Sequence, residues 1–273
     1  MDLGKQQPAG FLETLWDFYA HHGRGGLPWR QAETGGGFDP YKIMVSELML
    51  QQTQVPRVVP KYRTFLERFP TAARLAEAEL GDVLREWQGL GYNRRAKFLW
   101  QAAQTVAKLG HFPDTAAELV QLPGIGPNTA GAVLAYAYNR PVVFVETNVR
   151  TVYIHHFCGD REGIGDTEIA RLVEQTLDRE QPREFYWALM DYGSHLKATV
   201  GNLNKASKHY TKQSKFHGSR RQVRGQVIRL LGAKHHSLAE LQAAIADGRL
   251  AAVLHELEQE GLVRQSKHGT YGL

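Results

Sequence analysis

The chain has 273 residues, of which 42% are hydrophobic and 22% charged, and this is enough for a sizeable core and one to two domains. No apolar run reaches the ~18 residues that a membrane-spanning helix needs. The polar first segment, MDLGKQQPAG, lacks the basic-then-apolar pattern of a signal peptide, so we expect a cytoplasmic protein. The single cysteine, Cys158, excludes an intramolecular disulfide and a cluster held by four thiolates of this chain.

Helical periodicity dominates the first two-thirds of the chain. In chain order, helices are predicted over residues 11–23, 40–53, 55–69, 75–87, 94–109, 115–122, 128–138, 147–157, 166–177 and 183–196. Prolines such as Pro70, Pro113 and Pro141 separate them. No credible run of alternating strands precedes residue 200, so this part is predicted to be all-helical.

The remainder reads as a linker followed by a small module. Residues from about 197 to 217 are polar, basic and without periodicity, which indicates a linker or extended loop. Three helices over 220–231, 237–245 and 250–262 follow, with Ser237 and Glu240 as a capping box, and 263–273 has a β-like alternation. This pattern is typical of a winged-helix unit, which either reads DNA through a helix in the major groove or serves as a dimerisation or packing module.

The charge distribution indicates a polyanionic partner. The net charge is +5 and the pI is about 9.2. Between Asp191 and Glu240 the chain has ten Lys and Arg residues and no acidic one. A stretch of one sign that long suits nucleic acid, and with it a nucleoid location, while a solvated basic linker is the alternative.

The segment 121-QLPGIGPNTAGAVL-134 has two glycines at the start of a predicted helix. Gly124 and Gly126 allow positive φ and leave no Cβ to block a ligand. Their N–H groups, together with the following helix N-terminus, form an anion site that suits a DNA phosphate. With the preceding helix the segment reads as a helix–hairpin–helix, whose alternative is a tight turn without a ligand. A related Gly-x-Gly pattern occurs in 87-WQGLGYNRRAKFL-99.

The motifs together resemble the MutY family of adenine DNA glycosylases, within the helix–hairpin–helix glycosylase superfamily. The specific match is 45-VSELMLQQTQV-55, and LPWR at 27–30, GLGYNRRAKFL at 89–99, LPGIGPNTAGAVL at 122–134 and MDYGS at 190–194 follow the family's order. The resemblance covers roughly residues 11–200. It implies a mainly α, two-lobed glycosylase core at 1–200, followed by a basic linker at 201–217 and a winged-helix-like α+β domain at 218–273.

The implied chemistry uses two carboxylates around a flipped nucleotide. By resemblance, Glu47 is the general acid that protonates adenine at N7, and burial of a carboxyl in apolar surroundings favours that role by raising its pKa. Where the family typically has Asp-Gly-Asn-Val, this chain has 146-ETNV-149, so Glu146 holds the second carboxylate position and Asn148 keeps the amide. A pocket adjusted to Glu, a different substrate, a weak enzyme and a structural Glu146 all remain open, as does a purely structural Glu47.

The resemblance also implies a set of DNA contacts. Asn128 stands where bifunctional relatives carry a catalytic lysine, and an amide cannot form a Schiff base, which favours a monofunctional enzyme. Trp29 and Arg30 are expected near the adenine pocket, with core packing as the alternative for Trp29. The other residues expected to contact or open the duplex are Gln51, Gln52, Tyr92, Arg94, Leu122, Gly124, Gly126, Thr129, Lys212 and Lys215.

Two family features are missing from the sequence. Most relatives bind a [4Fe–4S] cluster through four cysteines after MDYGS, but this chain has KATVGNLNKASKHYTKQSKF, so we expect no cluster, no metal and lysine–phosphate contacts instead. Where relatives carry a Nudix-like C-terminal domain, the tail of this chain reads as the winged helix, so we expect no Nudix-like domain. We expect a monomer that binds double-stranded DNA with a mispair or lesion and removes adenine opposite guanine or 8-oxoguanine. The alternatives are a glycosylase for T or U opposite G or a damaged or bulky base, and a non-catalytic DNA-binding homologue.

Overall fold

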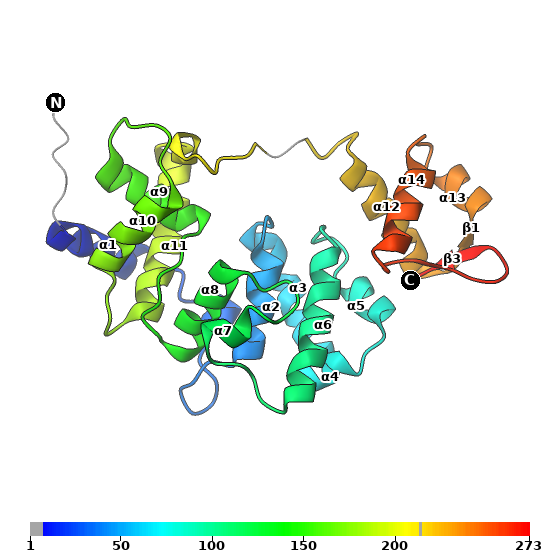
Figure 1. Cartoon of the computed structure of the whole chain (residues 1–273), viewed down its shortest axis with the longest axis horizontal. Helices are drawn as coiled ribbons and strands as arrows, with labels where there is room; N and C mark the ends of the chain where they lie inside the picture. The colour runs from blue at the N-terminus through cyan, green and yellow to red at the C-terminus, as the bar shows by residue number, and fades with distance from the viewer. Residues whose placement is uncertain (1–7, 213–214) are drawn as a thin grey trace. The chain divides into compact units, whose positions relative to one another are not determined.

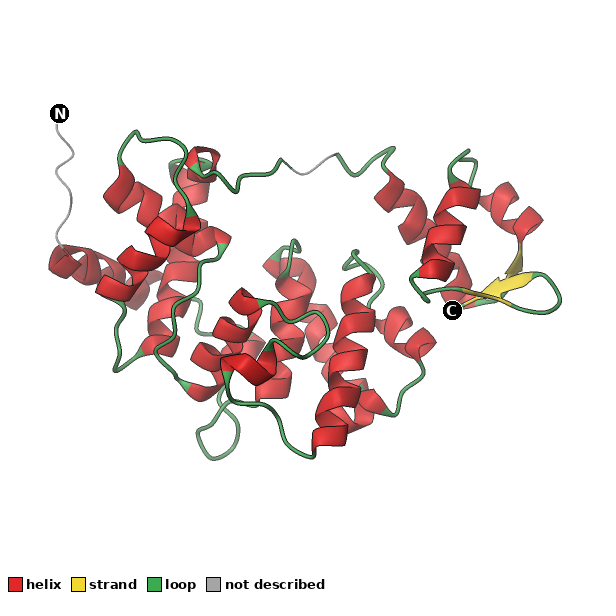
Figure 2. Cartoon of the chain, in the orientation of Figure 1, coloured by secondary structure: helices red, strands yellow, loops and turns green. Residues whose placement is uncertain are grey.

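The computed structural model describes residues 8–212 and 215–273, which fall into two compact units interleaved along the sequence. The first comprises Met1–Ile43, Asp114–Val120 and Ile125–Lys212, and the second comprises Met44–Pro113, Gln121–Gly124 and Gln213–Leu273. Helices dominate the described chain, and its named strands lie at the C-terminal end (Figure 2). The prediction of a mainly helical fold with a small C-terminal α+β part is thereby confirmed.

The first unit is built around one long helix. Its elements (Figure 1) are α1 (Pro8–His22), the 3-10 turn η1 (Pro28–Arg30), α7 (Ala116–Leu119), α8 (Pro127–Tyr138), α9 (Thr147–Tyr153), the π-helical turn η2 (Ile154–Cys158), α10 (Asp166–Thr176), α11 (Pro182–Thr199) and the 3-10 turn η3 (Leu203–Ala206). Helix α11 packs against α1, α8 and α9 and buries Phe185, Tyr186 and Leu189 completely. Each such side chain contributes about 1.5–3 kcal/mol, so the burial of α11 stabilises this unit substantially.

The second unit places α6 at the centre of its helical part. Its elements there are the end of α2 (Pro40–Leu50), α3 (Val55–Arg68), α4 (Ala72–Ala76), α5 (Leu80–Glu86) and α6 (Arg94–Leu109). One face of α6 carries Leu99, Ala102 and Val106, and this buried stripe packs on α4 and α5. Gly110 ends α6 in the left-handed region at φ 75°, which is the usual C-terminal stop of a helix.

The C-terminal module belongs to the second unit. It contains α12 (Arg220–Ala233), β1 (His236–Ser237), α13 (Leu238–Ala244), α14 (Leu250–Gln259), β2 (Arg264–Gln265) and β3 (Thr270–Gly272). The strands form an antiparallel sheet in the order β1-β3-β2, with Tyr271 opposite both His236 and Gln265. The predicted capping box is present, because Ser237 accepts from the Glu240 N–H and Glu240 accepts from the Ser237 N–H. Three helices and this small sheet match the winged-helix pattern.

Several helices differ from the sequence prediction, and the one predicted over 40–53, for example, ends at Leu50. The helix predicted over 75–87 is two helices, because Glu79 has an extended backbone and begins α5 anew. The helix predicted over 115–122 ends at Leu119, and the one over 147–157 becomes a π-helical turn after Tyr153. In the segment expected as a linker, α11 continues to Thr199 and η3 follows.

The segment around η3 is attached to the first unit by specific contacts. The buried Asn204 donates its amide N–H to the Thr151 hydroxyl at 2.6 Å, and Ser207 forms an isolated parallel bridge with Ile164. In the part of the chain described here, no helix has the length and apolar character that crossing a membrane requires.

Candidate functional site

The helix–hairpin–helix joins α7 to α8 through residues 120–126. Leu122 and Ile125 are 2% and 5% exposed, so the two apolar side chains anchor the turn. Gly126 is the N-cap of α8 and Pro127 its first residue, which leaves the first N–H groups of the helix without intrahelical acceptors. Gly124, Gly126 and Asn128 are exposed, whereas Thr129 is buried. The exposed turn therefore has the features of an anion site.

The two glycines of this hairpin are glycines for different reasons. Gly124 has φ +78°, and a Cβ there would lie 2.6 Å from Cβ of Phe98, so the fold itself requires glycine. Gly126 has φ −89°, and a Cβ there would meet nothing within 4 Å. The folded chain thus has room for a side chain at Gly126, and a ligand that approaches the backbone supplies a reason for its absence.

Asn128 connects the hairpin to the segment that carries Glu146. Its amide nitrogen donates to the Val145 carbonyl at 2.8 Å, and its amide oxygen accepts from the Val145 N–H at 3.4 Å. The Asn128 side chain therefore binds both backbone polar groups of Val145, the residue directly before Glu146. A positioning role of this kind was not evident from the sequence.

Glu146 is the N-cap residue of α9 and is half-buried. Burial raises the pKa of its carboxyl, and the Arg150 guanidinium only partly opposes that effect. Arg150 is itself held by Asp166 in a two-point ion pair at 2.7 and 2.8 Å. The net effect is a raised pKa, which makes the Glu146 carboxylate a stronger base than a surface glutamate.

Asn148 lies at the contact between α9 and α11. Its amide donates to the Met190 carbonyl at 3.2 Å, and a Cβ on Gly193 would lie 2.5 Å from the Asn148 carbonyl oxygen. Glycine at 193 is therefore what allows α11 to approach Asn148. Two residues of the MDYGS motif, Met190 and Gly193, thus contact Asn148, whose amide the sequence analysis singled out.

Glu47 is a half-buried residue in the C-terminal half of α2. Its neighbours Val45, Ser46, Leu48 and Met49 are all buried. Glu47 belongs to the second unit and Glu146 to the first, so the convergence of the two carboxylates stays a prediction.

Arg95 was missed by the sequence analysis and organises the segment after Glu47. Its guanidinium donates six hydrogen bonds of 2.5–3.2 Å, all to groups of the α2 C-terminal end and the loop before α6: the carbonyls of Leu48, Met49, Gln51, Leu90 and Gly91, and the Thr53 hydroxyl. Burial lowers its pKa to about 10, so the group stays charged at neutral pH. The signal was available, because Arg95 falls on the same helical stripe as Leu99, Ala102 and Val106.

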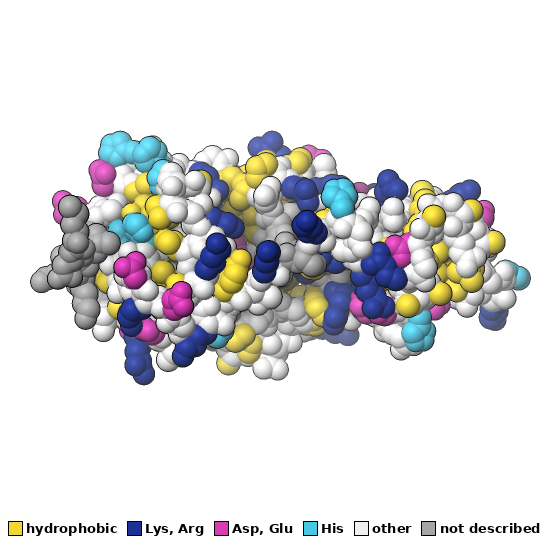
Figure 3. Space-filling model, turned by 90° about the horizontal axis from the view of Figure 1, so that it is seen from above, with side chains coloured by type: hydrophobic (Ala, Val, Ile, Leu, Met, Phe, Trp, Pro, Cys, Tyr) yellow, Lys and Arg dark blue, Asp and Glu magenta, His cyan; other side chains and the backbone are white. Residues whose placement is uncertain are grey.

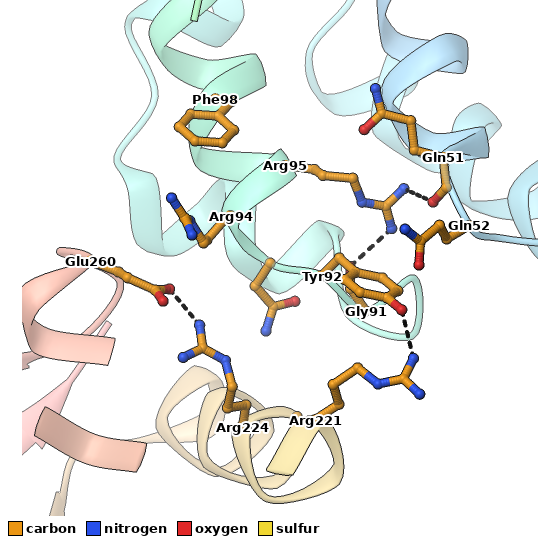
Figure 4. Close-up of a pocket in the computed structure, with 12 residues that line it drawn as sticks. Gln51, Gln52, Gly91, Tyr92, Arg94, Arg95, Phe98, Arg221, Arg224 and Glu260 are labelled. Atoms are coloured by element: carbon orange, nitrogen blue, oxygen red, sulfur yellow. Dashed lines mark hydrogen bonds and ion pairs between the residues drawn. The ribbon is translucent and has the colours of Figure 1, made fainter. Parts of the chain in front are cut away.

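The residues expected to open the duplex surround a pocket of about 570 Å³ (Figure 4). Gln52 and Tyr92 both have positive φ, at 55° and 49°, which is uncommon for residues other than glycine and concentrates at functional sites. Residues lining the pocket come from three segments: Gln51 and Gln52 after α2, Gly91 to Arg95 and Phe98 at the start of α6, and Arg221, Arg224, Gly225 and Glu260 of the C-terminal module. The structure thus brings together four predicted site residues, Gln51, Gln52, Tyr92 and Arg94.

Trp29 and Arg30 are deeply buried, at 6% and 7% exposed. Arg30 forms a two-point ion pair with the buried Asp191, at 2.8 Å for both bonds, and Arg24 donates to the same carboxylate. The guanidinium of Arg30 also lies 5.3 Å from the Trp187 ring centroid. These contacts give Arg30 a structural function in the first unit.

Figure 3 shows Lys and Arg side chains at the surface, with acidic side chains among them. Lys212 and Lys215 are both exposed and flank positions 213–214, which lie outside the described residues.

The residues of this chain do not supply the four thiolate ligands that an iron–sulfur cluster needs. Cys158 is the only cysteine, and it is buried in the π-helical turn, where burial raises the pKa of its thiol. Over residues 8–212 and 215–273, no group of three or more His, Cys, Asp or Glu side chains could hold a metal ion.

Comparison with known proteins identifies the family. Residues 45–179 match the model of the HhH-GPD superfamily base excision DNA repair protein. An adenine DNA glycosylase of Mycolicibacterium smegmatis is 33% identical over 276 residues, which cover 92% of this chain and 92% of that protein. An adenine DNA glycosylase of Mycobacterium tuberculosis is 41% identical over 174 residues, covering 62% and 56% of the two chains.

Other relatives are longer than this chain. An adenine DNA glycosylase of Buchnera aphidicola is 34% identical over 218 residues, which cover 76% of this chain but only 60% of that protein. Among solved structures, a thermostable thymine-DNA glycosylase has a TM-score of 0.60 at 22% identity and covers 74% of this chain and 96% of its own, which shows a shared fold. The motifs, the fold and these relatives together show that the chain belongs to the adenine DNA glycosylase family of the HhH-GPD superfamily.

Proposed function

We propose that this protein is a monofunctional DNA glycosylase of base excision repair, which hydrolyses the N-glycosidic bond of adenine mispaired with guanine or 8-oxoguanine. The observation that carries the proposal is the segment 45-VSELMLQQTQV-55 in a chain related over 92% of its length to an adenine DNA glycosylase. Cleavage of this bond requires that the departing base be protonated and that positive charge on the sugar be stabilised. Two glutamates serve these needs.

Glu47 is proposed as the general acid. It is a half-buried carboxyl among buried apolar neighbours, and its helix ends at the segment that Arg95 holds in place. A proton delivered to adenine N7 turns the base into a better leaving group. General acid catalysis of this kind contributes about 10²–10⁴-fold in rate.

Glu146 is proposed to stabilise the developing oxocarbenium ion at the deoxyribose. Its raised pKa supports this role, because a more basic carboxylate interacts more strongly with positive charge. The role requires the ionised form, so the excision rate should fall when the pH drops below the pKa of Glu146. Asn128 and Asn148 support this segment through their contacts with Val145 and Met190.

Asn128 supports a hydrolytic reaction without strand cleavage. An amide that donates to and accepts from the backbone of Val145 offers no amine for a Schiff base. We also propose that catalysis proceeds without an iron–sulfur cluster, since one cysteine cannot supply four thiolate ligands.

Duplex DNA is the proposed partner, held by a monomer in the cytoplasm. The α7–α8 hairpin would bind a phosphate through its N–H groups, and the pocket around Tyr92 would accommodate the opened base pair. Lys212 and Lys215 would add phosphate contacts that depend on salt.

A panel of duplexes tests the proposal. Each carries one mispair (A opposite G, A opposite 8-oxoguanine, T opposite G or U opposite G), and the released base is identified after single-turnover reaction. We expect free adenine and an intact abasic strand. Release of thymine or uracil without adenine would assign another substrate, and binding without release of any base would indicate a non-catalytic homologue.

A further inference from the structure

Tyr92 occupies a backbone conformation that it does not adopt by preference. Its φ of +49° lies in the left-handed region, where an aromatic residue is strained unless its surroundings hold it. The residue begins the turn into α6 and contributes its ring to the pocket of Figure 4. A side chain in this position needs contacts from outside its own turn.

Two arginines hold the Tyr92 ring. The Arg95 guanidinium lies 5.5 Å from the ring centroid and belongs to the same turn of chain. The Arg221 guanidinium lies 5.4 Å from the centroid and also donates to the Tyr92 hydroxyl oxygen at 2.6 Å. Arg221 therefore contacts both the face and the hydroxyl end of the ring, and it comes from α12 of the C-terminal module.

The module is attached in a way that keeps Arg221 in place. Lys97 of α6 donates to the Glu260 carbonyl at 2.5 Å, and Arg85 of α5 donates to the Gly232 carbonyl at 3.0 Å. Helix α12 starts at a proper cap, since the Ser219 hydroxyl accepts from the Gln222 N–H. Arg224, one turn after Arg221, is paired with Glu260. Arg221 thus projects from an anchored helix.

We propose that Arg221 is a positioning residue that holds Tyr92 ready to enter the duplex, so that the C-terminal module takes part in opening the base pair. The inference rests on the proposed function, because it assigns Tyr92 the role of inserting into DNA. Preorganisation of the ring removes the cost of ordering it when DNA binds. Loss of Arg221 should therefore slow base extrusion more than it weakens duplex binding.

The test compares Arg221→Ala with Arg229→Ala. Arg229 is exposed on the same helix and is not among the residues lining the pocket, so its removal changes the net charge equally. Base extrusion is followed with 2-aminopurine at the target position, whose fluorescence rises when the base leaves the stack. We expect Arg221→Ala to slow extrusion about tenfold, as loss of a hydrogen bond from a charged donor implies, and Arg229→Ala to have less than about a twofold effect.

Two further variants separate positioning from a direct DNA contact. Arg221→Lys keeps the charge and should restore part of the extrusion rate. In a Tyr92→Ala background, Arg221→Ala should cause no further loss, because the residue on which it acts is gone. Equal effects of Arg221→Ala and Arg229→Ala, or a full tenfold loss in the Tyr92→Ala background, would overturn the inference. Since fluorescence reports extrusion without bond cleavage, a failure to excise adenine would contradict the proposed function alone.

Discussion

Alanine substitutions at the two hairpin glycines should separate folding from DNA binding. At Gly124 the backbone has φ +78°, which costs an L-residue roughly 1–2 kcal/mol. The new Cβ would lie 2.6 Å from Phe98 Cβ and 3.0 Å from its Cγ, and such overpacking costs about 1–3 kcal/mol. Together these terms predict that Gly124→Ala lowers the free energy of unfolding by about 2–5 kcal/mol, or Tm by about 10 °C.

Gly126→Ala should leave the fold intact. Its φ of −89° suits alanine, and the added methyl group would have open space around it. We expect a free energy of unfolding unchanged or raised by less than about 1 kcal/mol. The methyl group would nevertheless occupy the surface where a phosphate approaches the N–H groups, so duplex affinity should fall about tenfold through a lost charge-assisted hydrogen bond.

Thermal unfolding followed by circular dichroism and duplex binding followed by fluorescence anisotropy, both over a salt series, measure the two effects. The reasoning fails if Gly126→Ala binds with the affinity and salt dependence of the parent, because the hairpin would then hold no phosphate. If Gly124→Ala unfolds at the same Tm as the parent, the argument that the fold requires glycine at position 124 is wrong.

The other predictions concern stability and its pH dependence. Arg95→Met keeps the side-chain volume but leaves buried carbonyls without a donor. The free energy of unfolding should therefore fall by about 3–5 kcal/mol, which the midpoint of urea denaturation measures. Burial raises the pKa of Glu146, so the stability that this residue contributes is full below its ordinary pKa of 4.5 and is lost as the pH rises. Glu146→Gln should therefore raise the free energy of unfolding at pH 7.5 by on the order of 1 kcal/mol, and the gain should vanish near pH 4. Burial lowers the pKa of His156 to about 4, so the stability that this residue contributes is full above about pH 6.5 and is lost as the pH falls to 4. His156→Gln should therefore reduce the change in the free energy of unfolding between pH 6.5 and 4 by about 1 kcal/mol, after allowance for the solvent exposure of His156.

Periodicity located most helices because apolar residues recur along them at helical spacing and are buried. Residues 94–109 and 183–196 were predicted within a few positions of α6 and α11, whose stripes pack on their neighbours. The break before α5 and the π-helical turn after Tyr153 were missed, since both depend on backbone geometry that leaves the apolar pattern unchanged.

Glu47 and Glu146 were chosen from the sequence because their residue type carries the chemistry, and their catalytic roles stay predictions. The contacts that support the site could not be predicted from the sequence. The Asn128 contact with Val145 spans 17 positions, and the Arg221 contact with Tyr92 spans 129, so neither follows from local pattern. Arg95 is the intermediate case, because a charged residue on a buried stripe could have been recognised as a structural centre.

The most direct test of the account is the single-turnover rate of adenine release by Glu47→Gln, Glu146→Gln and the double variant, at a pH where the parent is fastest. If both carboxylates act on one nucleoside, each substitution should lower the rate by about 10²–10⁴-fold, and the double variant should lose far less than the product of the two effects. Release of adenine by Glu47→Gln at the parent rate would contradict the account.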